Sequence, residues 1–141
     1  MNTIKRKNKG FTLLEIIIVV IIVGVLASLA LPRLFSTVEF SRSTEALSAM
    51  GSLRSSMERC LLASGNTYVG CTMATIDMAN PATSPGSHFT SYTIADQSAT
   101  GYTITALRNT IDGGVGTDTI IVTQAAAGVT RSGTTAFAGI K

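Results

Sequence analysis

A single carboxylate, Glu15, lies at the start of the most apolar stretch of the chain. The residues that follow it, 16–31 (IIIVVIIVGVLASLAL), carry no charged side chain. A charge within a membrane helix costs about 2.5–3.5 kcal/mol on insertion scales, so Glu15 requires a cationic partner. Cleavage after Gly10 would create a free amino group on Phe11, which lies four residues before Glu15 and on the same helix face. Such a cleavage would give the Glu15 carboxylate a cationic partner, whereas a secretory signal peptide cut near Ala27 or Ala30, or a plain signal anchor, would leave Glu15 unexplained.

Cys60 and Cys71 are the only two cysteines in the chain. Outside the cytoplasm, an even number of cysteines favours a disulfide. Closing so short a loop would stabilise the fold by about 2–3 kcal/mol. We expect a Cys60–Cys71 disulfide that ties the end of a helix to the loop after it, and two free thiols are the alternative.

No constellation of residues predicts catalysis. His88 is the only histidine, and without a second histidine or a cysteine cluster it does not predict a zinc site. No serine lies in a Gly-x-Ser-x-Gly motif. The segment from Asp112 to Asp118 could wrap a calcium ion, but it lacks the EF-hand pattern, and a glycine-rich hairpin loop is the favoured interpretation. The chain has no Trp, which leaves no stacking platform for nucleic acid. We expect no enzyme activity, no cofactor, no metal and no nucleic-acid partner.

Charge and hydropathy are distributed unevenly along the 141 residues. The chain is 45% hydrophobic and 13% charged, which excludes an intrinsically disordered protein. Residues 1–10 hold four basic side chains and no acidic one, so their removal changes the formal net charge from +3 to −1. The basic character therefore belongs to an N-terminal leader and does not indicate nucleic-acid binding.

Residues 11–33 predict a membrane-spanning helix. At about 1.5 Å per residue, residues 11–31 would extend about 30 Å, the thickness of a bilayer's hydrocarbon core. A buried core helix is the alternative, but a domain this small could hardly enclose a helix that is apolar all round. The positive charges before Phe11 place the N-terminus in the cytoplasm. Gly24 and Pro32 are weak points, because glycine costs about 1 kcal/mol and proline about 3 kcal/mol in a helix relative to alanine.

Residues 34–64 predict an amphipathic continuation of this helix. Apolar side chains recur at spacings of three and four residues, at Ala46, Met50, Leu53, Met57 and Cys60. On the polar face, weak ion pairs are possible between Arg42 and Glu45 and between Arg54 and Glu58. Gly65-Asn66 is typical of a helix end. The pattern thus predicts one long helix from residue 11 to residue 64.

Residues 65–141 predict a β-rich domain. Short alternating runs rich in Thr, Tyr, Ile and Val predict strands at residues 88–95, 102–107, 119–123 and, more weakly, 129–132. Residues 72–87 have no clear period and should form a surface connection. The expected fold class is α+β, in which a long N-terminal helix packs on a C-terminal antiparallel sheet of three to four strands.

The residues KGFTLLE at positions 9–15, followed by the apolar run, resemble the class III signal of type IV prepilins and type II secretion pseudopilins. The resemblance is strong over residues 1–40 and absent as a motif beyond about residue 70. It implies that a prepilin peptidase cleaves between Gly10 and Phe11 and then N-methylates Phe11. It also implies that Glu15 pairs with the N-terminal ammonium of its own or a neighbouring subunit during assembly. In filaments of this family, the helix is often melted between the positions of Gly24 and Pro32.

The resemblance implies a structural subunit of a type IV pilus. Residues 1–10 would be a cleaved leader, residues 11–33 a membrane anchor and later the filament core, residues 34–64 an amphipathic helix, and residues 65–141 a head. The prepilin would cross the inner membrane once, with its N-terminus in the cytoplasm. The pilus assembly machinery would then polymerise it into a helical homo-oligomer that is extracellular or periplasmic.

Two alternatives to a pilus subunit remain open at this level. A pseudopilin of a type II secretion system, or a minor pilin, would share the same N-terminal signal. A signal-anchored extracytoplasmic binding domain is the more distant alternative. Glu15 and the Gly10–Phe11 junction argue against it, because neither a secretory signal nor a plain anchor needs them.

Overall fold

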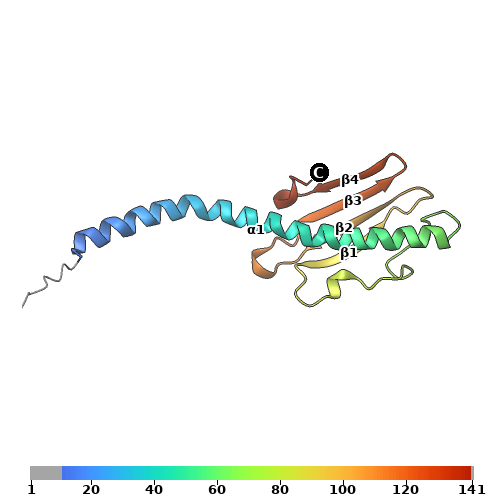
Figure 1. Ribbon diagram of the computed structural model, residues 1–141, viewed down its shortest axis with the longest axis horizontal. Coiled ribbons are helices and arrows are strands. Elements are labelled where there is room, and N and C mark those ends of the chain that lie inside the picture. The colour runs from blue at the N-terminus through green and yellow to red at the C-terminus, as the bar shows by residue number, and fades with distance from the viewer. Residues whose placement is uncertain (1–10, 141) are drawn as a thin grey trace, which may run out of the picture. The chain divides into compact units, whose positions relative to one another are not determined.

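The computed structural model describes residues 11–140. Over these residues it contains one long helix, α1 (Leu13–Ala63), and four strands, β1 (Phe89–Ala95), β2 (Tyr102–Arg108), β3 (Thr119–Ala125) and β4 (Gly128–Gly133) (Figure 1). Three single-turn 3-10 helices lie in the connections, η1 (Pro81–Thr83), η2 (Ile111–Gly113) and η3 (Thr135–Phe137). The chain divides after Phe35 into two compact units. We call the second unit, described over residues 36–140, the head.

In the first unit, α1 continues without a break through Gly24 and Pro32. A Cβ atom at Gly24 would meet no other heavy atom within 4 Å, so the glycine is not required by close packing within the chain. Pro32 has no amide hydrogen, and the carbonyl of Ser28, four residues earlier, therefore lacks its usual donor. The weakening of the helix at Gly24 and Pro32 stays a prediction.

The head is an antiparallel meander of four strands in the order β1-β2-β3-β4, as the alternating runs predict. The register between β2 and β3 places Ile104 opposite Val122, and the side chains of both residues are buried. Each strand begins and ends within two residues of the predicted bounds. The predicted α+β fold class is confirmed.

One stripe of α1 forms half of the core of the head. Its fully or almost fully buried apolar side chains are Ala46, Met50, Leu53 and Met57, as the helical spacing predicts, whereas Cys60 at the end of the predicted stripe is only partly buried. The sheet contributes inward-facing residues of β1, β2 and β3, including Tyr92, Tyr102, Ile104 and Val122. Burying a large apolar side chain contributes about 1.5–3 kcal/mol, so this stripe is the main stabilising contact between helix and sheet.

The end of α1 confirms the predicted stop signal. The helix ends at Ala63, and Gly65 and Asn66 follow with φ angles of 74° and 68°. The amide of Asn66 donates to the carbonyl of Leu61 at 2.9 Å, which satisfies one of the last helical carbonyls.

Candidate processing and assembly site

The start of α1 is capped by Thr12, a role that our sequence reasoning missed. The amide of Glu15 donates to Thr12 Oγ1 at 3.2 Å and to the Thr12 carbonyl at 3.1 Å. Thr-x-x-Glu is the sequence pattern of a capping box, so residues 12–15 carried the signal. The cap places Glu15 in the first turn of α1, where the positive end of the helix dipole favours a carboxylate.

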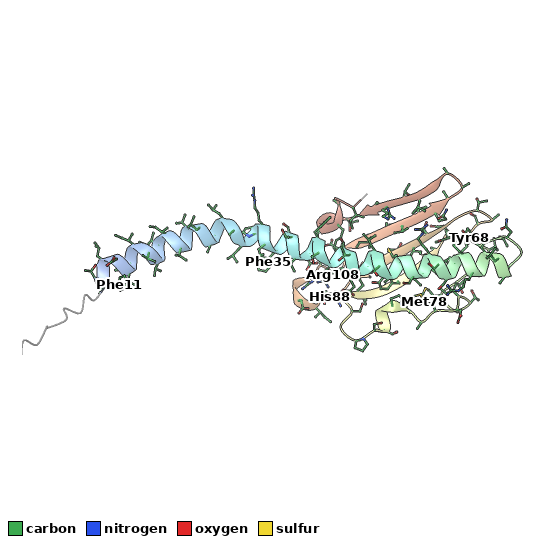
Figure 2. All side chains as sticks on the ribbon, in the orientation of Figure 1. Phe11, Phe35, Tyr68, Met78, His88 and Arg108 are labelled. Carbon is green, nitrogen blue, oxygen red and sulfur yellow. A yellow bond between two sulfur atoms is a disulfide. The ribbon has the colours of Figure 1, made fainter. Side chains whose placement is uncertain are left out.

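An exposed apolar surface surrounds Glu15 and continues along the first unit. The side chain of Phe11 is 79% exposed, and the large apolar residues from Leu13 to Phe35 are each close to half exposed or more (Figure 2). Among residues 11–140, α1 is long and apolar enough to cross a membrane, and none of its most apolar window is buried. Such a surface requires lipid or other apolar helices around it.

The predicted chemistry next to this surface lies partly outside the described residues. Gly10 and the basic leader belong to residues 1–10, so cleavage between Gly10 and Phe11 stays a prediction, as does N-methylation of Phe11. Glu15 forms no ion pair with any side chain among residues 11–140. Its pairing with an N-terminal ammonium is likewise a prediction.

The predicted disulfide between Cys60 and Cys71 is confirmed. Their Cα atoms lie 6.0 Å apart, within the normal range for a disulfide. The bond joins the last turn of α1 to the turn that follows Tyr68, and Cys71 is completely buried. It therefore fixes the connection through which the chain leaves the helix for the sheet.

Replacing both cysteines by serine is expected to lower the free energy of unfolding by about 2–3 kcal/mol, because the bond closes a short loop. Urea unfolding of the detergent-solubilised chain, followed by near-ultraviolet circular dichroism, measures the change. The three tyrosines, Tyr68, Tyr92 and Tyr102, are all buried in the head and supply the signal. Ser64→Ala is the matched control, since Ser64 Oγ lies near both sulfur atoms. An unchanged urea midpoint in the double variant would contradict the prediction.

An ion pair between a buried arginine and a partly buried glutamate joins α1 to β2, and it was not predicted. The side chain of Arg108 is 0% exposed, and its Nε and Nη2 donate to the two carboxylate oxygens of Glu39 at 2.9 and 3.1 Å. Arg108 Nη1 also donates to the carbonyl of His88 at 2.7 Å, and the two residues lie side by side in Figure 2. We call the Glu39–Arg108 pair the clasp. The sequence did carry a signal. From Tyr102 onward, alternate residues of β2 face inward, and Arg108 places a charged side chain at one of these inward-facing positions.

A β2–β3 loop, residues 109–118, closes over the clasp. Arg108 Nη1 donates to Asn109 Oδ1 at 2.6 Å, and Nη2 donates to the carbonyl of Ile111 at 3.3 Å. A Cβ atom at Gly114 would lie 2.5 Å from Arg108 Cζ, so glycine is needed for this close approach. The guanidinium is thus satisfied by one carboxylate and several loop oxygens, as a buried cation requires.

Other charged side chains of α1 make contacts beyond those that their helical spacing predicts. The pairs Arg42–Glu45 and Arg54–Glu58, which the helical spacing permits, are not among the ion pairs of residues 11–140. Arg42 Nη1 instead donates to Glu39 at 2.6 Å. Glu45 accepts from His88, and Glu58 accepts from the Tyr68 hydroxyl, because neighbouring elements offer better placed donors.

The two aspartates of the segment that could have wrapped a calcium ion, Asp112 and Asp118, are engaged with protein groups. The Asp112 carboxylate lies 3.9 Å from Arg42 and 3.5 Å from His88 Nε2, and the Asp118 carboxylate accepts from the Thr135 hydroxyl. Within residues 11–140 no group of three or more His, Cys, Asp or Glu side chains is arranged to hold a metal ion.

The clasp makes the stability of the head depend on pH. The hydrogen bond from Arg108, together with the positive charges of Arg108 and Arg42, lowers the pKa of Glu39 from its usual 4.5 against the opposing effect of burial. A carboxyl whose pKa is lower in the folded state stabilises the fold above its unfolded pKa and loses that contribution as the pH falls through the folded pKa.

We therefore expect the head's thermal midpoint to fall as the pH drops below 4.5, the usual pKa of the Glu39 carboxyl. Thermal unfolding between pH 7 and pH 2 measures this. In Glu39→Gln the midpoint should start lower and fall less steeply. Parallel curves for the two proteins would contradict the assignment to Glu39.

Comparisons with known proteins identify a family motif at the start of the chain and relatives that match it over longer stretches. Residues 5–31 match the model of the "Prokaryotic N-terminal methylation motif" family. The "Type IV major fimbrial protein FimA" of Dichelobacter nodosus is 34% identical over 109 residues, which cover 77% of this chain and 69% of that protein. No solved structure matches.

Two further relatives match over shorter lengths. A "Probable minor fimbrial protein" of Dichelobacter nodosus is 48% identical over 65 residues, which cover 46% of this chain and 40% of that protein. The "Type II secretion system core protein G" of Dickeya chrysanthemi is 43% identical over 54 residues, which cover 38% of this chain and 35% of that protein. The methylation motif and the fimbrial relative that matches over 77% of this chain show that the chain belongs to the family of type IV pilins and type II secretion pseudopilins.

Proposed function

We propose that this protein is a structural subunit of a type IV pilus and has no catalytic role. The observation that carries the proposal is the apolar surface of α1, exposed on every side from Leu13 to Phe35 and preceded by the methylation motif. Before assembly, lipid would cover this surface, and after assembly the equivalent helices of neighbouring copies would cover it. In a polymer of identical subunits, neighbouring helices would cover this apolar surface along its whole length.

The proposal divides the chain into four working parts. Residues 1–10 are a basic leader that holds the N-terminus in the cytoplasm and is removed by prepilin peptidase. Residues 11–33 anchor the subunit in the inner membrane and then form the filament core. Residues 34–64 are the amphipathic half of the helix, which carries the β-rich domain formed by residues 65–141.

Cleavage supplies the positive charge that Glu15 needs, and methylation preserves that charge. Hydrolysis of the Gly10–Phe11 peptide bond creates a new amine at Phe11, and methylation leaves that amine basic. The ammonium and the Glu15 carboxylate then neutralise each other in an apolar environment. Because an unpaired carboxylate there is costly, a subunit that is out of axial register would be disfavoured.

A type II secretion pseudopilin is the second candidate. The 43% identity with core protein G of Dickeya chrysanthemi favours it. That match covers 38% of the chain, whereas the fimbrial relative matches over 77%. The broader match supports the pilus subunit as the first choice.

Shearing the producing cells and measuring the intact mass of the main filament protein tests the proposal. We expect this chain to be that protein, to begin at Phe11, to carry one added methyl group and to retain its disulfide. Retention of Lys9 would contradict the processing step. Absence from the sheared fraction, together with a loss of protein secretion when the chain is deleted, would favour the pseudopilin.

A further inference from the structure

A groove with two arginines lies between α1 and the β4 edge of the head. Its volume is about 230 Å³, and its lining residues are Leu47, Met50, Gly51, Arg54, Val122 and Arg131. Arg131 is the cross-strand partner of Val122, whose side chain is buried in the core. Directly paired residues of neighbouring strands share one face of a sheet, so Arg131 lies on the face that α1 covers.

The two arginines of the groove have no carboxylate partner in the head. Arg54 Nη2 makes a long contact of 3.5 Å with Gln124 Oε1, and the Arg54 side chain also interacts with the buried hydroxyl of Tyr102. Glu58, one turn further along α1, is engaged by the Tyr68 hydroxyl at 2.8 Å. A carboxylate that entered the groove would therefore gain charge-assisted hydrogen bonds from guanidinium groups that no carboxylate of the head neutralises.

The head also presents an exposed carboxylate without an ionic partner on its other flank. Within residues 36–140 the exposed acidic side chains without an ion pair or hydrogen bond are those of Asp77 and Asp96. Asp96 lies in the turn at one end of the sheet. Asp77 lies beside Arg59, on the flank of α1 opposite Arg54, and its neighbour Met78 lies on the β1 side of the helix in Figure 2.

We propose that the groove of one copy receives the Asp77 carboxylate of a neighbouring copy, between Arg54 and Arg131. The inference rests on the proposed function, because it needs a polymer of this chain. Repeated contacts along a helical polymer join two different surfaces of the subunit. β1 and β4 form the opposite edges of the sheet, so a basic groove beside one edge and an acidic residue beside the other have the required complementarity.

Zero-length crosslinking of sheared filaments tests the contact. The variant Arg131→Lys keeps the positive charge and adds an amine that a carbodiimide joins to a carboxylate, with loss of water. We expect a crosslinked dimer in which mass spectrometry identifies an amide between position 131 of one copy and Asp77 of another. Thr130→Lys is the matched control, since adjacent residues of a strand point to opposite faces, and it should give no such peptide. Filaments of Arg131→Lys that yield no crosslink to Asp77 would overturn the contact and leave the proposed function intact.

Charge reversal provides a second readout in cells. Arg131→Asp and Asp77→Arg should each lower the sheared filament yield about tenfold, and their combination should restore most of it, because close charge pairs at interfaces are strongly coupled. Normal yield in both single variants, or no recovery in the double variant, would overturn the proposal. A different outcome would assign the groove to phosphate instead of Asp77. In that case Arg131→Asp filaments would form at unchanged yield but would no longer retain a double-stranded DNA oligonucleotide. If the unsubstituted chain forms no filament, the proposed function fails, and this contact fails with it.

Discussion

Replacing Glu39 by alanine is expected to lower the free energy of unfolding of the head by about 3–5 kcal/mol, because it leaves a buried guanidinium without its counter-charge. Arg108 is 0% exposed, and the loop oxygens around it carry only partial charges. Arg42 would also lose its acceptor on Glu39. Domains of this size are stable by about 5–15 kcal/mol, so the variant should still fold at neutral pH.

Urea unfolding of the detergent-solubilised chain measures this loss through the buried tyrosines of the head. Glu45→Ala is the matched control: Glu45 lies on the same helix and bonds His88, but its side chain is 37% exposed. Its removal should cost about 1 kcal/mol or less, as for other exposed pairs. Equal losses in the two variants would show that burial of Arg108 does not set the strength of the clasp.

Replacing Glu15 by alanine is expected to leave processed protein in the membrane but to reduce filament yield by more than about tenfold. The physical reason is that the N-terminal ammonium would enter an apolar core without a counter-charge. Comparing the mature protein in membranes with that in the sheared fraction separates processing from assembly. Glu15→Asp, which keeps the charge on a shorter side chain, should recover part of the yield.

Thr12→Ala distinguishes the charge of Glu15 from its place in the helix cap. Thr12 accepts a hydrogen bond from the Glu15 amide, so this variant weakens the cap and leaves the carboxylate unchanged. If charge pairing drives assembly, Thr12→Ala should retain most of its filaments. A loss as large as that of Glu15→Ala would instead assign the effect to the start of the helix.

The elements of this fold were predictable where the sequence signal is local. The helix was predicted from residue 11 to 64 and runs from Leu13 to Ala63, because apolar spacing and the Gly65 stop signal are read within a few turns. Four strands follow from alternation over short runs. The disulfide was predictable from the even number of cysteines and their expected position outside the cytoplasm.

The clasp was not predictable because its partners come from distant parts of the chain. Glu39 and Arg108 lie 69 positions apart, and only the packing of α1 on β2 brings them together. Local spacing permitted Arg42–Glu45 and Arg54–Glu58, yet Arg42 pairs with Glu39 on the same helix, while Glu45 and Glu58 bond His88 and Tyr68 from other parts of the chain. At the processing site, residues 12–15 carry a helix-capping signal as well as part of the methylation motif. The capping signal places Glu15 in the first turn of α1, and the motif places it next to the expected cleavage site.

The clasp also determines how the head bears a mechanical load. α1 is covalently continuous from the first unit into the head, and Glu39 lies four residues beyond the boundary at Phe35. Tension along the helix therefore reaches the head close to this residue. The two hydrogen bonds from Arg108 transmit it sideways into β2, and the ladders of the meander distribute it to the neighbouring strands. A subunit that lacked the clasp would shift the same force onto the apolar stripe of α1 and onto the remaining polar contacts between helix and head, such as Glu45–His88 and Glu58–Tyr68.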